Sequence, residues 1–576
     1  MSIVIDLKAK DHVRRIAYYD GVGSANVRVD AREGDSWRHL FTDSLVRYLE
    51  WTLRDFDVNT RYLRLMFETP AAQVGELLVD AQPLEPVAST TEPAPVRRGP
   101  LMDDFIGVNG FIDDPVERLA AFGHVREYHQ WQWDAGNQNP DYKGYPDDLL
   151  AWSPSWVSGP GWGWDFDQFY RELNARGVEV VPCLQGSALY IHDHESDKVG
   201  WKPIKANEDT TDPQSYIEHA SHLFQFAARY GATKVEDSLL KLREGQPHLS
   251  GLGLIRYLEN WNEPDRWWAG RNEYFSPFEL AAMSSADLDG HRGALGPTAG
   301  VRAADSQMKL VMGGRALPEI EYLRAMQLWA ELNRNGEFPA DVINLHHYSN
   351  DAGGQGGQPT TGISPEADGL RERFGKIARW RDEQLPDAEL WMSEFGYDTN
   401  PNSVQRAPAI GDTPAEEVQA CWIIRSFLEL AGSGVDRAQL YMLRDVNAGN
   451  TVKYNSSGVT TETWNKHQPK RAWFYINTMK NTVKGTRPIG DVASDNERVR
   501  VMKFKSDDGL KTIFALWCPS ANNEVVQGFQ LRIPDKTTAR IVQLEAGESM
   551  GKNATLRIQD SLAKIEVTER PVFVVC

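Results

Sequence analysis

The chain has 576 residues and is strongly acidic, with a formal net charge of −19 at pH 7. This charge argues against nucleic acid and against an anionic membrane surface as partners, and it makes a strongly acidic substrate less expected. No run of about 18 or more apolar residues occurs, so no transmembrane helix is expected. With 41% hydrophobic and 25% charged residues, the composition is that of a globular protein with a large core, divided into about three domains.

The first two segments in chain order are a β-rich module and a linker. Residues 1–86 lack helical periodicity over most of their length, and YLRLMFETPAAQVGELLVD, 62–80, is typical of two strands around a turn. This stretch resembles the closing strands of discoidin-like modules, which bind carbohydrate, although a β-sandwich that only supports its neighbour fits equally well. Residues 87–100 belong to a stretch with Pro, Ser and Thr but no apolar periodicity, which indicates a linker.

Strands and helices alternate over residues 101–482. The clearest expected helices are 165–177, 212–231 and 413–434. This alternation predicts an α/β fold, and eight strands with intervening helices predict a (β/α)8 TIM barrel. The expected strands are 105–111, 124–131, 178–186, 254–261, 309–314, 341–348, 389–396 and 438–445.

Short alternating segments separated by Gly and Asp turns fill residues 483–576. They predict a C-terminal β-sandwich, for which a purely structural role is the favoured interpretation.

Four cysteines do not make a disulfide framework. Cys183 and Cys421 are expected to be buried packing residues, whereas Cys518 and Cys576 fall on expected strands of the last domain, which leaves a bond between them open. No CxxC or HExxH spacing occurs, so we expect no metal and no other cofactor.

The most informative stretch is GLIRYLENWNEPDRWW, 253–268. Its apolar residues predict a strand, and Pro264 cannot continue a central ladder. Glu263 is therefore expected at the C-terminal end of a strand, where barrel enzymes hold catalytic groups. Nearby tryptophans such as Trp261 and Trp267 offer aromatic faces on which sugars stack, so an acid among indoles suggests a carbohydrate site.

A second acid occurs in the same context. AELWMSEFGYD, 388–398, is an apolar run in which Glu394 stands where a strand should end, before Gly396. Two glutamates at the ends of two buried strands are the groups that glycoside hydrolysis uses. One protonates the leaving oxygen, and the other attacks the anomeric carbon or activates water.

These motifs resemble clan A of the glycoside hydrolases over roughly residues 101–480. The WNEPD motif followed by aromatics is most similar to families 39 and 5, without fixing the family. In chain order, the matches are Arg126 near the end of strand 2, Asn262 and Glu263 at strand 4, His346 and Tyr348 as His-x-Tyr at strand 6, and Glu394 at strand 7.

The resemblance implies a retaining mechanism for β-linked glycans. Glu394 would be the nucleophile and Glu263 the general acid/base, with a carboxyl separation of about 5–5.5 Å. Asn262 would hydrogen-bond the sugar 2-OH. His346 would bind substrate or orient a carboxylate, and His347 should point to the other side of the strand because side chains alternate.

The resemblance also implies that Arg126 and Tyr348 keep Glu394 ionised. Other roles stay open for both: Arg126 could form an ordinary ion pair with Glu127 or Asp134, and Tyr348 could be a packed phenol at the barrel rim.

Several aromatic residues are candidates for substrate contacts. Trp131 and Trp133, in the long loop 131–164, and Trp267 are expected to line sugar subsites, although packing beneath the loop is an equal alternative for any single one. Clan A usually has an aromatic residue after strand 8, where the expected strand ends instead in Arg444 and Asp445, so Trp464 is the candidate for that place. The glycine-rich segment 353–358 is expected to be a mobile rim of the active face.

The expected partner is thus an oligo- or polysaccharide. A carbohydrate-binding protein of the same fold whose catalysis has lapsed, or a transglycosylase, are the alternatives. Sugar identity, endo or exo action and oligomeric state stay open. We expect a secreted or periplasmic protein whose signal is absent from this sequence, since glycan hydrolases with added β modules are usually exported, but a cytoplasmic location is also open.

Overall fold

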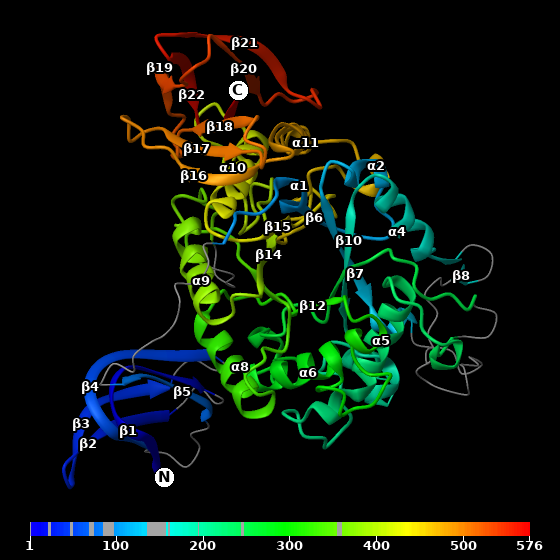
Figure 1. Cartoon of the computed structure of the whole chain (residues 1–576), viewed down its shortest axis with the longest axis vertical. Helices are drawn as coiled ribbons and strands as arrows, with labels where there is room; N and C mark the ends of the chain where they lie inside the picture. The colour runs from blue at the N-terminus through cyan, green and yellow to red at the C-terminus, as the bar shows by residue number, and fades with distance from the viewer. Residues whose placement is uncertain are drawn as a thin grey trace.

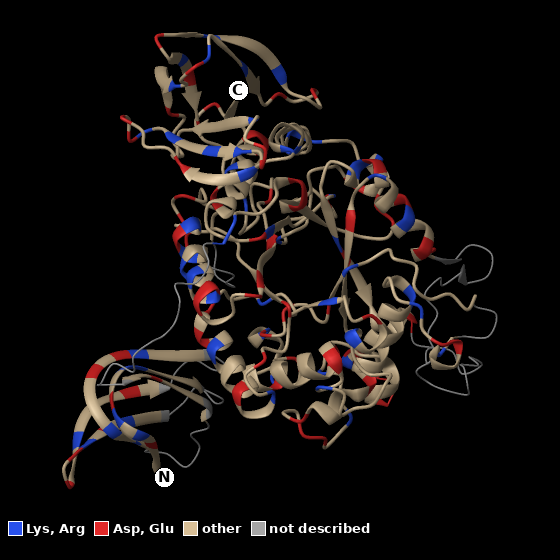
Figure 2. Cartoon of the chain, viewed as in Figure 1, with Lys and Arg blue, Asp and Glu red and all other residues tan. Residues whose placement is uncertain are grey.

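The computed structural model describes residues 2–20, 25–45, 50–67, 74–83, 97–134, 157–158, 162–193, 195–242, 247–353 and 360–576. Three parts follow one another along the chain: an N-terminal sheet, a central barrel and a C-terminal sheet (Figure 1). Acidic and basic residues are spread over all three parts (Figure 2).

The N-terminal part is a five-stranded antiparallel sheet with the order β3-β2-β4-β1-β5. The two strands expected over residues 62–80 lie on either side of β1, so they do not pair with each other. Tyr19 stacks on Tyr274 of the barrel with ring centroids 5.0 Å apart, and Arg15 pairs with Glu321 at 2.8 Å. The strands are β1 (Ser2–Asp20), β2 (Ala25–Glu33), β3 (Ser36–Leu45), β4 (Glu50–Phe67) and β5 (Val74–Pro83).

The central part is a closed barrel of eight parallel strands, which confirms the predicted (β/α)8 fold. The strands follow one another around the barrel in sequence order, and all eight occur where the sequence predicts them. They are β6 (Ile106–Gly110), β7 (His124–Gln130), β10 (Glu179–Gln185), β11 (Tyr257–Glu259), β12 (Lys309–Val311), β13 (Val342–His346), β14 (Glu389–Phe395) and β15 (Arg437–Leu440).

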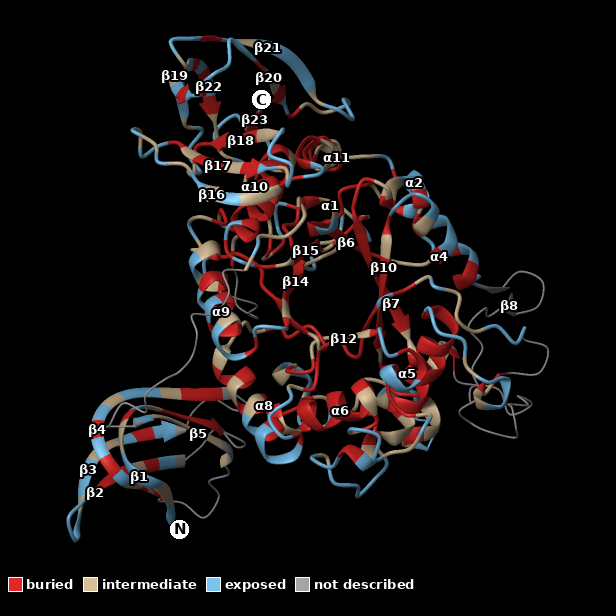
Figure 3. Cartoon of the chain, in the orientation of Figure 1, coloured by how far each residue is buried: buried red, intermediate tan, exposed pale blue. Residues whose placement is uncertain are grey.

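Helices cover the outside of the barrel and share one core with the strand side chains that point toward them (Figure 3). A separate buried cluster comes from the alternate positions of the strands: Val181, Tyr257, Val311, Val342 and Trp391. In α4 the Asp165 side chain accepts a hydrogen bond from the Gln168 N–H, as expected for an N-cap. The main helices are α4 (Phe166–Ala175), α5 (Ile217–Tyr230), α6 (Pro277–Asp289), α8 (Ile320–Asn333), α9 (Leu370–Gln384), α10 (Ala415–Ala431) and α11 (Arg471–Val483). Shorter ones are α1 (Met102–Phe105), α2 (Val116–Leu119), α3 (Trp131–Asp134) and α7 (Val301–Ala304).

The C-terminal part is an antiparallel sheet of eight strands that encloses a core of its own. One face of β17 and β18 packs instead on the barrel helices α10 and α11, and Trp517 donates a hydrogen bond to Glu366 of the barrel at 2.8 Å. Arg570 pairs with Glu417 of α10 at 2.7 Å. The strands are β16 (Arg487–Asp491), β17 (Arg500–Lys505), β18 (Thr512–Trp517), β19 (Val525–Arg532), β20 (Thr538–Gln543), β21 (Lys552–Gln559), β22 (Leu562–Thr568) and β23 (Val572–Val575).

All four cysteines are free, so Cys518 and Cys576 form no disulfide. Among the described helices, none is both long enough and apolar enough to cross a membrane.

Candidate active site

Glu263 and Glu394 meet at the C-terminal ends of their strands. Glu394 is the penultimate residue of β14, and Glu263 follows β11 by four residues, where a bridge between Asn262 and Gly314 extends the pairing. The backbone of Glu263 has a φ of 46°, a conformation that non-glycine residues adopt rarely and that often marks functional sites. Its N–H donates to the Gly314 carbonyl at 2.8 Å, which holds this conformation in place.

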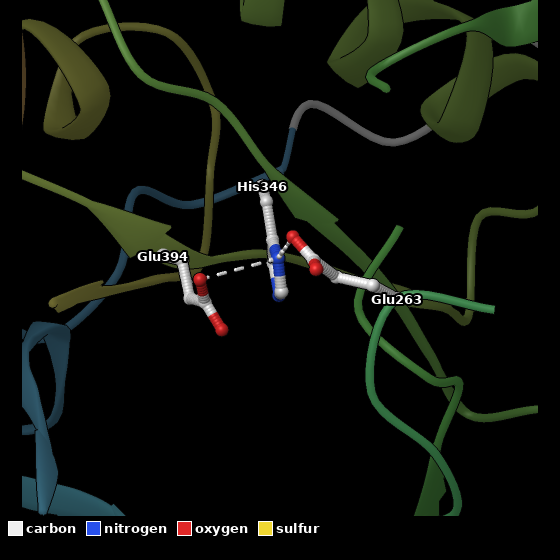
Figure 4. Close-up of side chains that lie close together, drawn as sticks. All are labelled: Glu263, His346 and Glu394. Carbon is white, nitrogen blue, oxygen red and sulfur yellow. Dashed lines mark hydrogen bonds and ion pairs between the residues drawn. The ribbon is translucent and has the colours of Figure 1, made fainter. Parts of the chain in front are cut away.

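His346 stands between the two carboxylates (Figure 4). Its Nδ1 lies 3.3 Å from Oε1 of Glu263 and 3.5 Å from Oε2 of Glu394. One oxygen of each glutamate and one nitrogen of the histidine all lie within 4.8 Å of one another. The neighbouring His347 points to the other side of the strand, where its Nε2 lies 2.6 Å from Asp368.

Three donors surround the carboxylate of Glu394, which is 5% exposed. Arg126 and Tyr128 donate to its Oε1 at 2.9 and 2.5 Å, and Tyr348 donates to its Oε2 at 2.9 Å. Burial raises the pKa of Tyr128 and Tyr348 well above the usual value, so both hydroxyls keep their protons and serve as donors. A cation and two hydroxyls thus hold this carboxylate in a fixed orientation.

Arg126 is held by a second buried acid that the sequence motifs do not include. Its Nε and Nη2 donate to the two oxygens of Glu259 at 2.6 and 2.8 Å, and all these side chains are almost completely buried. The ion pair with Glu127 or Asp134 that sequence left open does not form. Glu127 accepts a hydrogen bond from Tyr170, and Asp134 lies 2.8 Å from Nε2 of His129.

Asn262 is oriented by the same guanidinium. Arg126 Nη2 donates to Oδ1 of Asn262 at 2.8 Å, and Arg126 Nη1 donates to Oδ1 of Asn109 at 2.9 Å. With its oxygen held by Arg126, the amide of Asn262 has its NH2 group to offer to a ligand.

The aromatic residue after strand 8 is Tyr441, which corrects the sequence interpretation. The expected strand 438–445 ends earlier, at Leu440, so the residue at the strand's end is Tyr441 and not Arg444 or Asp445. The Tyr441 ring packs edge-on against Tyr128, with centroids 6.3 Å apart. The apolar residues YML continue the strand pattern past the point where hydrogen bonding to the neighbouring strands stops. The predicted end of this strand was therefore too late.

Tyr454 completes this aromatic wall from the loop between β15 and α11. Its ring lies 4.8 Å from that of Tyr348 and 5.4 Å from that of Tyr441, measured between centroids. The hydroxyl is buried and has no hydrogen-bond partner among the described residues. Burial, with the nearby charges of Glu263 and Glu394, raises the pKa of Tyr454 well above its usual value, so this hydroxyl also stays protonated.

The tryptophans named by sequence lie in different surroundings. Trp131 is 2% exposed and stacks on His222 of α5, so it has no free face, and Trp133 packs edge-on against His129. Trp267 follows Glu263 in a short 3-10 helix, Trp267–Ala269, against the exposed Trp268. Trp464 is 65% exposed, and none of its described contacts joins it to the two carboxylates.

Most of the loop 131–164 and of the glycine-rich segment 353–358 lies outside the described residues, so their expected roles stay predictions.

Sequence reasoning missed Tyr128, Glu259, Tyr441 and Tyr454. Strand alternation could have found the first two, because Tyr128 is two residues after Arg126 on β7 and Glu259 is two after Tyr257 on β11. Tyr454 comes from an irregular loop, for which no sequence pattern gives a position.

No protein-family model matches the chain, and no curated protein matches it in sequence. Solved structures of similar fold include a GH30 endoxylanase from Clostridium papyrosolvens, at 9% identity and a TM-score of 0.47, covering 83% of this chain and 97% of that one. A glucosidase from Croceicoccus marinus is 12% identical with a TM-score of 0.49, covering 83% and 97%. An arabinose-bound GH51 α-L-arabinofuranosidase is 11% identical with a TM-score of 0.39, covering 100% and 83%. At such identities, what these enzymes bind or cleave is a property of those proteins alone.

Proposed function

We propose that this protein is a retaining glycoside hydrolase of the clan A type that acts on β-linked glycans. The observation that carries the proposal is the pair Glu263 and Glu394 at the ends of two barrel strands. One oxygen of each lies within 4.8 Å of the other. Retaining enzymes have carboxyl groups about 5–5.5 Å apart, whereas inverting enzymes need about 6.5–9.5 Å to admit a water molecule.

The different surroundings of the two glutamates support different roles. Glu394, which three donors hold in a fixed orientation, is suited to attack as the nucleophile. Glu263 lies nearer the surface, with a side chain 16% exposed, and Nδ1 of His346 lies 3.3 Å from its Oε1. It is suited to exchange a proton with the leaving group and then with water.

The reaction has two steps. In the first step, an oxygen of Glu394 bonds to the anomeric carbon as the bond from that carbon to the leaving oxygen breaks. Glu263 donates its proton to the leaving oxygen. Glu263 then takes a proton from water, the water oxygen bonds to the anomeric carbon, and the bond to Glu394 breaks. Asn262 would hydrogen-bond the 2-OH of the sugar, a contact that strengthens in the transition state.

The test is turnover of a panel of β-linked polysaccharides and aryl β-glycosides, with aryl α-L-arabinofuranosides included. Glu394→Gln should abolish turnover. Glu263→Gln should slow poor leaving groups far more than good ones, because only poor leaving groups need the proton. The anomer released first, followed by NMR, should have the substrate's configuration, and product of inverted configuration would refute the mechanism.

The two alternatives have distinct results in the same experiment. Glycan binding without turnover across the panel would favour the carbohydrate-binding protein. Transfer of the glycosyl group to an added sugar in preference to water would identify a transglycosylase, which uses the same residues.

A further inference from the structure

The two glutamates and His346 form a set of ligands as well as a catalytic pair. One nitrogen and two carboxylate oxygens converge on one point, and Figure 4 shows the imidazole between the two acids. Among the described residues, this is the one group of three or more such side chains whose ligand atoms lie close enough together to hold a metal ion.

Two of the three distances between ligand atoms fit a tetrahedral ion. Zn²⁺ binds histidine nitrogen at about 2.0–2.1 Å and carboxylate oxygen at about 2.0–2.2 Å, which puts neighbouring ligand atoms about 3.3–3.6 Å apart. Nδ1 of His346 lies 3.3 Å from the Glu263 oxygen and 3.5 Å from the Glu394 oxygen. The two carboxylate oxygens are at most 4.8 Å apart, so a small rotation of the more exposed Glu263 side chain would complete the geometry.

The surroundings hold Glu394 and His346 in place. Tyr348 and Arg126 fix the Glu394 carboxylate, and groups that hydrogen-bond a ligand in this way strengthen metal sites. The His346 ring lies against Gly314, where a Cβ atom would be 2.2 Å from Nε2. The close backbone therefore keeps Nδ1 directed toward the two acids.

We propose that this site binds one divalent transition-metal ion, with Zn²⁺ the best fit, and that the bound ion blocks the glycan. Histidine and carboxylate ligands suit Zn²⁺, and three protein ligands leave a fourth position open to water. Mg²⁺ and Ca²⁺ prefer oxygen ligands alone and a higher coordination number, so they should bind poorly. The binding is independent of the proposed function, whereas the inhibition rests on it.

Binding is tested by calorimetric titration of the EDTA-treated and dialysed full-length protein with ZnCl2. The wild type should show one site that MgCl2 does not occupy. His346→Ala should weaken Zn²⁺ binding at this site by about 100-fold or more, since it removes a direct ligand. Glu263→Gln removes a second ligand with almost no change of shape, so it should weaken binding even if His346→Ala fails to fold.

The matched control is His39→Ala in the N-terminal sheet, where the histidine side chain is 44% exposed. This variant should keep the binding site intact. Equal Zn²⁺ affinities of wild type and Glu263→Gln would overturn the proposal, because the ion would then bind elsewhere.

The second measurement separates this proposal from the proposed function. If the protein hydrolyses a glycan, Zn²⁺ should inhibit in competition with substrate, and EDTA should restore the rate. Site-specific binding in a protein that hydrolyses nothing would support the metal site while the proposed function fails. Hydrolysis that Zn²⁺ does not inhibit, at concentrations that saturate the site, would overturn the inhibition.

Discussion

Arg126 and Glu259 form an ion pair with two hydrogen bonds, of 2.6 and 2.8 Å, beneath the candidate site. Breaking a buried pair by removing one partner costs about 3–5 kcal/mol, because the remaining charge loses its compensation. We therefore expect Glu259→Gln to lower the free energy of unfolding by a few kcal/mol and to lower kcat/KM, since Arg126 also holds Glu394. Chemical denaturation and steady-state kinetics measure the two effects.

The control for this variant is Glu389→Gln. Glu389 pairs with Lys309 at 2.6 Å at the start of β14, away from the strand end that carries Glu394. It should lower stability but leave kcat/KM unchanged. An unchanged kcat/KM in Glu259→Gln would show that Arg126 does not need this partner.

The hydroxyls of Tyr128 and Tyr348 should each contribute to the rate. Hydrogen bonds to charged groups contribute about 1.5–3 kcal/mol, so Tyr128→Phe and Tyr348→Phe should each lower kcat/KM by about 10- to 150-fold. Tyr18→Phe, which removes a hydroxyl donor to Asp43 in the N-terminal sheet, should keep the full rate. A full rate in both active-site variants would mean that Arg126 alone suffices to hold Glu394.

The aromatic residue that serves the sugar site should be Tyr441 and not Trp464. Tyr441→Ala should raise KM or lower kcat/KM by about 10-fold through the loss of a ring contact, whereas Trp464→Ala, on an exposed side chain, should change either by less than about two-fold. A large effect of Trp464→Ala with little effect of Tyr441→Ala would instead support Trp464 as the aromatic residue of the sugar site, as the sequence predicts.

Tyr454 should contact the bound glycan through its buried hydroxyl. Tyr454→Phe keeps the ring packing against Tyr348 and Tyr441 and removes only the oxygen. We expect kcat/KM to fall by about 5- to 10-fold, the effect of one neutral hydrogen bond, with no loss of stability. Lower stability with an unchanged rate would instead identify Tyr454 as a structural residue.

The stability of the protein should depend on Asp114. Burial raises the pKa of Asp114 from 3.8 to about 7, even though Arg444 lies 2.8 Å away. Between these two pH values the folded state holds a proton that the unfolded state has lost, so this group lowers the free energy of unfolding as pH rises from about 4 to 7. Asp114→Asn removes the titration.

The stability of Asp114→Asn relative to wild type should therefore rise between pH 4 and pH 8. The upper limit is about 4 kcal/mol for a shift of about three units. Urea denaturation of both proteins at several pH values measures the difference. A difference that does not change with pH would mean that Asp114 titrates alike in the folded and unfolded states.

The sequence predicted those parts of the molecule that depend on local pattern. All eight barrel strands follow from apolar runs, and the two glutamates follow from the two runs that end in an acid near Pro264 or Gly396. Strand ends were less certain, because the apolar residues after Leu440 continue the pattern where pairing stops. Alternation along β11 could place Glu259 on the inner face of its strand, but its partner Arg126 lies more than 100 positions away. Tyr454 comes from an irregular loop and contacts Tyr348, also more than 100 positions away, so no local pattern predicts it.

The face of the C-terminal sheet that packs on α10 and α11 should make barrel and sheet unfold as a single cooperative unit. Trp517 and its neighbours would lie in water if the two parts came apart, and the helices that support strands 7 and 8 would lose their outer cover. Heating should therefore unfold both parts together. Proteolytic removal of the sheet should shift Glu394 by loosening the helices that pack behind its strand. Within the part of the chain that the structure describes, the side chains that contact Glu394 all belong to the barrel.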